Sequence, residues 1–246
     1  MQAYFTIEMY QLFMHSSLIF WAMKKPIVIL TLLMVMLSLG AASYYVGAEG
    51  GVTFNTVIAG TGYRSYEYDW AAGYKASVPF VVAFNDNFAL ETGFSLYGRS
   101  YNYTQKVDLS DGTKQTNFDL AVRNGFMTIP LLMRVYVPVG EFDFYASLGG
   151  WVGFWAYGSR SGSVMNGNDK SESVKEKTDL SLYNRFDAGV SAKLGFDVNF
   201  GSFKGYVEGG YDLSLTDMNV RQKHGSFPVH NSTFSVTLGV LMGIDR

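Results

Sequence analysis

Ten ionisable side chains lie on the polar faces of segments in which polar and apolar residues alternate, and their spacing would let them take part in chemistry. Charges of opposite sign that share one buried face form either a salt-bridged network or a path for ions and protons. The type of chemistry therefore depends on which of them meet. The residues are Glu49, Glu91, Arg99, Arg134, Asp143, Lys193, Asp197, Lys204, Glu208 and Asp212.

The segment 185–216 positions half of these side chains. Apolar residues occupy every even position from Phe186 to Phe200, which is the side-chain period of a β-strand. Gly201 and Ser202 then invert the parity, as a two-residue hairpin turn does. Two paired strands with one continuous apolar face are therefore predicted.

The hairpin register predicts specific neighbours on the polar face. It places Lys193 opposite Gly210 and diagonal to both Glu208 and Asp212, within reach of a long side chain. The other diagonal ion pairs predicted in this way are Asp197 with Lys204 and Arg134 with Asp143.

Composition favours a membrane protein rather than a soluble one. Charged residues make up 16% of the 246 residues, below the ~25% of ordinary soluble proteins. Aromatic residues reach 16% and glycine numbers 27, as in barrels with aromatic girdles and close strand contacts. A net charge of −2 gives no reason to expect nucleic acid, and the absence of cysteine excludes disulfides and thiolate metal sites.

The alternating segments predict an all-β fold, an eight-stranded antiparallel transmembrane up-and-down β-barrel. The apolar face of the hairpin carries no charge, which suits a wall that faces lipid, whereas a lipocalin-type barrel would turn this face inward. Short turns are expected in the periplasm and long loops outside, so both termini lie in the periplasm. The predicted turns are 85–87, 138–141 and 201–202, and the predicted loops are 58–73, 106–115, 159–182 and 217–231.

The first part of the chain has the features of a secretory signal peptide. Residues 23–43 combine a basic start, a short apolar core and a small-residue exit, so a signal-peptide helix is predicted there. Residues 1–22 then precede the natural initiator, Met23; the alternative is a long leader with real membrane contact. The barrel is expected to cover 44–246.

Two irregularities are predicted in the middle of the chain. The apolar set is even at Phe118 and odd at Met127, which predicts a β-bulge at Asn124-Gly125. Pro130 then points inward, and because proline in a strand usually marks an edge or a bulge, local strain is expected there.

An eight-stranded barrel has a lumen filled by side chains, so a salt-bridged plug is expected. The alternative for the same charges is a gated ion or proton path. Trp151, Trp155 and Tyr157 are expected to point inward as packing residues, the alternative being a sugar-binding platform. His224 and His230 lie in a predicted loop without the fixed spacing of a metal site, and neither a catalytic residue nor a cofactor is expected.

Four stretches resemble the small outer-membrane β-barrel family that includes the PorT-like proteins and, in size, OmpX- and OmpW-like barrels. They are Val46–Val52, Met127–Leu132, Tyr145–Gly150 and Phe186–Val190. The family implies outer-membrane location and no catalytic residues, and its PorT-like members are linked to protein secretion. One departure is the chain end at Arg246, because such barrels often end in an aromatic residue.

Together these features predict a non-enzymatic barrel whose loops act in surface interaction or envelope structure. The alternatives are a narrow channel for small or hydrophobic solutes, with a lateral opening near Pro130, and an accessory subunit of a secretion system. The expected partners are outer-membrane lipid and an envelope or secretion protein, with no nucleic acid, and the barrel is expected to be a monomer.

Overall fold

A computed structural model describes residues 43–59, 66–108, 114–166, 170–218 and 228–244. The predicted signal-peptide helix within 23–43 and the predicted extension 1–22 lie outside the described residues, apart from Ser43, which begins the first strand. Among the described residues, no helix is long and apolar enough to cross a membrane.

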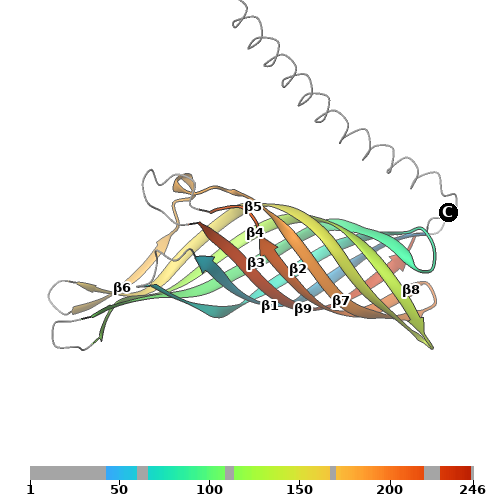
Figure 1. Cartoon of the computed structure of the whole chain (residues 1–246), viewed down its shortest axis with the longest axis horizontal. Helices are drawn as coiled ribbons and strands as arrows, with labels where there is room; N and C mark the ends of the chain where they lie inside the picture. The colour runs from blue at the N-terminus through green and yellow to red at the C-terminus, as the bar shows by residue number, and fades with distance from the viewer. Residues whose placement is uncertain (1–42, 60–65, 109–113, 167–169, 219–227, 245–246) are drawn as a thin grey trace, which may run out of the picture. The chain divides into compact units, whose positions relative to one another are not determined.

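Within the described residues, nine antiparallel strands form one sheet, and eight of them close into a ring through the pairing of β4 with β5 (Figure 1). The ring order is β4-β3-β2-β1-β9-β8-β7-β5, and β6 pairs with β5 outside the ring. The predicted antiparallel barrel is confirmed. The strands are β1 Ser43–Ala59, β2 Tyr66–Ala83, β3 Phe88–Asp108, β4 Lys114–Val139, β5 Phe142–Asn166, β6 Lys170–Lys177, β7 Phe186–Phe200, β8 Phe203–Ser214 and β9 Val229–Gly243.

The two faces of the ring have opposite chemistry, as alternation predicts. Large apolar side chains point outward, and Leu148, Leu194 and Leu238 are 68%, 69% and 64% exposed. Buried charged side chains, including Glu91, Arg134 and Lys193, lie on the opposite, inner face. Because the charged face is the interior, the wall suits lipid, and the lipocalin alternative is wrong.

The β7–β8 hairpin has the predicted register. Lys193 pairs with Gly210, and Phe200 pairs with Phe203 across the turn. Gly201 has φ +71°, the left-handed conformation that favours glycine in such a turn.

Strands continue into three of the predicted loops, 58–73, 106–115 and 159–182. β3, β4 and β5 have 21, 26 and 25 residues, whereas a membrane-spanning strand needs only about 9–11. Their additional length, with β6, continues the sheet away from the ring, at the left of Figure 1. Alternation did not reveal these extensions because both faces of a sheet outside the lipid can be polar, while backbone pairing continues.

The predicted bulge lies at the right level but on the other strand. The β4–β5 register shifts between Gly125 and Phe126, which pair with Tyr157 and Trp155, so the extra residue is Ala156 on β5. From Phe118 to Tyr136 on β4, the even positions face inward. Phe118, Leu120 and Val122 are therefore inner-face residues, contrary to the prediction.

A row of two tyrosines and two glycines crosses four strands at this level. Tyr74 pairs with Gly98, Gly98 with Gly125, and Gly125 with Tyr157. The rings lie over the glycines on the outer face, and the tyrosine hydroxyls are 2.6 Å apart. Tyr157 is 52% exposed and faces outward, so its predicted inward position is wrong.

Candidate functional site

Six ionisable side chains from six strands form a network in the centre of the lumen, defined here as the central network. It holds three carboxylates and three cations, all buried. Lys193 Nζ lies 2.7 Å from Glu91 and 2.9 Å from Glu208. The remaining ion pairs are Lys75–Glu49 at 2.6 Å, Lys75–Glu208 at 3.8 Å, Arg134–Glu91 at 2.5 Å and Arg134–Glu208 at 3.4 Å.

Neutral hydroxyl groups complete the coordination of these carboxylates. Tyr145 donates to Glu208 at 3.1 Å, and Tyr206 donates to Glu49 at 2.8 Å. The Arg134 guanidinium lies 3.9 Å from the centroid of the Tyr145 ring, a cation–π contact. Each buried charge thus has an opposite charge beside it, which offsets much of the desolvation cost.

A second buried pair, Arg99 with Asp187, lies nearer the end with the long loops. Arg99 donates to Asp187 at 2.9 Å, and Thr216 and Asn231 donate to the same carboxylate at 2.5 Å and 3.2 Å. Ser214 also donates to Asp187. The guanidinium is surrounded by three rings, with centroid distances of 5.1 Å to Tyr97, 4.9 Å to Phe126 and 4.5 Å to Trp151.

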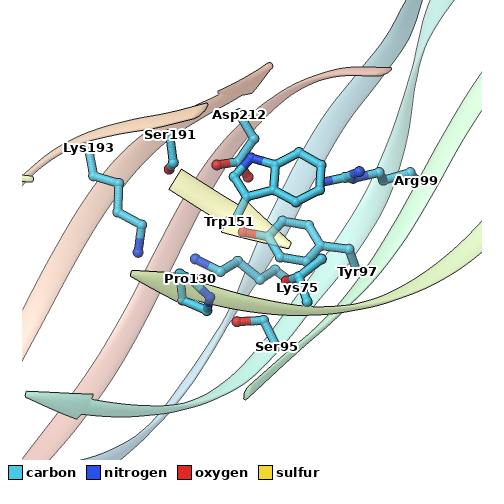
Figure 2. A pocket seen from close by; sticks show the side chains of 10 residues that line it. Lys75, Ser95, Tyr97, Arg99, Pro130, Trp151, Ser191, Lys193 and Asp212 are labelled. Carbon is cyan, nitrogen blue, oxygen red and sulfur yellow. The ribbon is translucent and has the colours of Figure 1, made fainter. Parts of the chain in front are cut away.

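The space between the central network and Arg99 is closed. Figure 2 shows Lys75, Lys193 and Asp212 directed into a cavity of about 10 Å³ that Trp151 and Tyr97 also line. A second cavity of about 10 Å³ lies beside Glu49 and Glu91. Each volume is about that of one water-sized probe, so neither provides a pore through the described barrel.

The predicted diagonal pairs are only partly formed. Lys193 does contact Glu208, but the ion partner of Lys193 on the far side of the lumen is Glu91, and Asp212 lines the cavity instead. Arg134 binds Glu91 and Glu208 rather than Asp143, so that prediction is wrong.

The short-turn end contains the remaining predicted charges. Lys204 pairs with Asp143 at 3.5 Å, not with Asp197 as predicted. Asp197 lies directly opposite Asp143 in the β5–β7 register and is fully buried. Lys204 also lies 5.4 Å from the Tyr45 ring centroid.

The long-loop end of the lumen is capped by apolar side chains. Phe126, Trp155 and Met218 are buried together, and Leu180 and Tyr183 from the segment around the short helix η2 (Leu180–Leu182) pack against them. Asp179 precedes this helix, and its hydrogen bonds with Ser181 hold the pKa of its carboxyl below the usual value. The cap places a second barrier above the central network.

The two inner tryptophans and His230 make hydrogen-bond contacts with backbone carbonyl groups. Trp151 donates to the Val190 carbonyl at 3.2 Å and Trp155 to the Tyr157 carbonyl at 2.8 Å, so both are packing residues. His230 Nδ1 lies 3.0 Å from the Thr216 carbonyl, and His224 is outside the described residues. In the described part of the chain, no three His, Cys, Asp or Glu side chains are grouped to hold a metal.

Sequence reasoning missed the contacts that cross the lumen. The alternation identified Glu91, Arg99 and Arg134 as inward residues, but it did not show that Glu91 pairs with Lys193 from β7. It also left Asp187, the partner of Arg99, out of the ten predicted site residues. The signal available was the inward parity of Asp187, two residues before Gly189 in the same alternating strand.

Comparison with known proteins identifies the family. The model of the outer membrane protein beta-barrel domain matches residues 42–219. No curated protein matches significantly.

Solved barrels resemble the chain at low identity. Neisserial surface protein A is 10% identical, with a TM-score of 0.40 over 82% of this chain and 98% of that one. OprG from Pseudomonas aeruginosa is 12% identical, with a TM-score of 0.41 over 83% and 97%. The outer membrane protease OmpT from Escherichia coli is 10% identical, with a TM-score of 0.42 over 82% and 96%. With its closed ring, apolar outer wall and matching family model, the chain belongs to the outer membrane protein beta-barrel domain family of the cell outer membrane.

Proposed function

We propose that the protein is a non-enzymatic surface-binding barrel that passes no solute and acts through the sheet extending beyond its ring. The observation that carries this proposal is the contrast between the two parts of the fold. The lumen holds buried ion pairs and cavities of about 10 Å³, whereas β4 and β5 have 26 and 25 residues. A strand of that length exceeds what a bilayer requires.

The closed lumen argues against the alternative of a narrow channel. Pro130 interrupts the β3–β4 ladder, as a proline must, because it has no backbone N–H to donate. Thr92 Oγ1 donates to the Pro130 carbonyl at 2.8 Å across this interruption. The two small cavities beside Pro130 give no lateral path for a solute.

Conductance in planar bilayers tests the closed lumen directly. We expect no stable unit steps from the wild-type protein. A variant that removes charge and bulk from the lumen, Arg134→Ala with Lys193→Ala, is the positive control for sensitivity. Reproducible wild-type steps would refute the proposal.

Accessibility from outside tests the placement of the extended sheet. Because the chain has no cysteine, single substitutions Ser173→Cys in β6 and Ser202→Cys in the β7–β8 turn give clean labels. A membrane-impermeant maleimide should label the first in intact cells and the second only after lysis. The reverse order would invert the topology and contradict the proposal.

Surface binding itself is tested with cells that express the protein. Replacing residues 160–176 by a short Gly-Ser turn removes β6 and its partner segment of β5 while leaving the ring. Attachment to panels of immobilised glycans and matrix proteins should fall to the level of cells without the protein. Unchanged attachment, with the shortened barrel present in the outer membrane, would show that the extension is not the binding element.

A further inference from the structure

The outer wall changes chemistry in a fixed order along β4 toward the long-loop end. Leu131 and Ile129 are 56% and 53% exposed and apolar. Gly125 follows, covered by the Tyr157 ring, and Arg123 comes next on the same face. Apolar wall, tyrosine and arginine in succession match the passage from acyl chains through the interface to the headgroups.

Cations from two further strands lie around this point. Ser159 on β5 pairs with Arg123 on one side and with Lys177 on the other, so both cations share the outer face. In the next row, Ser161 pairs with Lys175. We define Arg123, Lys175 and Lys177 as the outer basic cluster; all three are exposed.

The geometry lets these side chains converge. Arg123 and Lys177 are two strand spacings apart, about 10 Å, with only the small Ser159 between them. Both side chains are long enough to reach one anionic group above Ser159. A planar guanidinium and an ammonium group can together donate hydrogen bonds to the oxygens of one phosphate.

Arg185 extends the basic surface along the same edge of β5. Its guanidinium lies 4.2 Å from the centroid of the Phe154 ring, and its Nε donates to the Trp155 carbonyl at 3.1 Å. Phe154 is 41% exposed on the outer wall, so Arg185 lies at the lipid boundary rather than in the lumen.

Acidic side chains on these strands lie elsewhere. Glu176 is on the opposite face, paired with Arg160 at 2.6 Å. On the outer face, Asp119 pairs with Ser163 one row beyond the cluster, and Asp69 lies on β2 at the far end of the Lys175 row. On β4, β5 and β6, the row that contains Arg123, Ser159 and Lys177 therefore has basic side chains and no acidic side chain among its described residues.

We propose that the outer basic cluster binds the phosphate of a phosphorylated glycolipid in the outer leaflet. The acyl chains of that lipid lie on the apolar wall below Tyr157, and the phosphate lies between Arg123 and Lys177. This site is separate from the surface-binding function and does not depend on it. It would fix the height of the barrel in the membrane and order the base of the extended sheet.

The test measures lipid binding to the full-length protein purified in detergent, by native mass spectrometry. The probes are lipid A and the same lipid A after enzymatic removal of its phosphates. The variant is Arg123→Gln with Lys175→Gln and Lys177→Gln. The matched control is Arg160→Gln, which removes an exposed arginine from the same sheet but from its other face.

Wild-type protein should prefer the phosphorylated lipid, and each removed cation should weaken that binding about five-fold. Arg160→Gln should bind as the wild type does. Equal binding of both lipids, or an equal loss of binding in the Arg160→Gln control, would overturn the proposal. Heat-dependent gel mobility checks folding, and single Arg123→Gln gives the same reading if the triple variant does not fold.

Discussion

Replacing Glu208 by glutamine tests whether the central network holds the barrel together. The Glu208 carboxylate lies 2.9 Å from Lys193, 3.4 Å from Arg134 and 3.8 Å from Lys75. Glutamine keeps the shape of the side chain and removes its charge. Three buried cations would then face two carboxylates, Glu49 and Glu91.

The expected cost follows from what remains around the cations. Removing one partner of a buried ion pair destabilises a protein by roughly 3–5 kcal/mol. Lys193 keeps Glu91 at 2.7 Å, and the glutamine oxygen can still accept from Tyr145. The free energy of unfolding should therefore fall by about 3 kcal/mol, the lower end of that range.

The assay is urea unfolding of the protein folded in detergent micelles, followed by the fluorescence of the buried Trp151 and Trp155. The control is Glu176→Gln, whose partner Arg160 has a 45% exposed side chain; an exposed pair contributes less than ~1 kcal/mol. Adding Lys193→Met to Glu208→Gln restores neutrality and should recover more than half of the lost stability.

Two outcomes would refute this reasoning. One is that Glu208→Gln and Glu176→Gln destabilise the barrel equally. The other is that the double variant is less stable than Glu208→Gln alone, which would mean that shape rather than charge balance holds these side chains.

Three further substitutions test other parts of the fold in the same unfolding assay. Arg99→Met leaves Asp187 without its cation and should cost roughly 3–5 kcal/mol; a neutral effect would show that Ser214, Thr216 and Asn231 suffice. Gly125→Ala would place a Cβ 2.0 Å from the Tyr157 ring and should cost about 1–3 kcal/mol, and Tyr157→Ala added to it should relieve the clash; no relief would contradict the role of the ring. Gly201→Ala, at φ +71°, should cost about 1–2 kcal/mol, whereas an unchanged urea midpoint would mean that the turn can adopt another conformation.

Tyrosine and tryptophan rings cover glycines at several strand pairs. A Cβ at Gly195 would meet the Tyr145 ring at 2.5 Å, and one at Gly239 would meet the Tyr206 ring at 2.3 Å. These rings lie flat against the sheet inside the lumen and carry the hydroxyls that bind Glu208 and Glu49. These glycines thus help to build the site, because each ring can lie flat against the sheet only where the neighbouring residue has no side chain.

Alternation by itself determined the barrel, its inward and outward faces and the β7–β8 register. These features depend on neighbours in the chain or across one tight turn, where parity and turn length leave one arrangement. Lys193 opposite Gly210 is such a case. Parity also placed Glu91, Arg99 and Arg134 in the lumen.

Ring closure and lumen packing decided what alternation could not. Glu91 meets Lys193 because β3 and β7 face each other across the closed ring, and no local pattern encodes that distance. The bulge lies at Ala156 on β5 and not on β4, because two paired strands can accommodate an extra residue on either strand. The extensions of β3, β4, β5 and β6 could not be predicted from alternation, because strands outside the lipid need backbone pairing but no apolar face. Five of the ten predicted site residues joined Lys75 in the central network only when the closed ring brought their strands together.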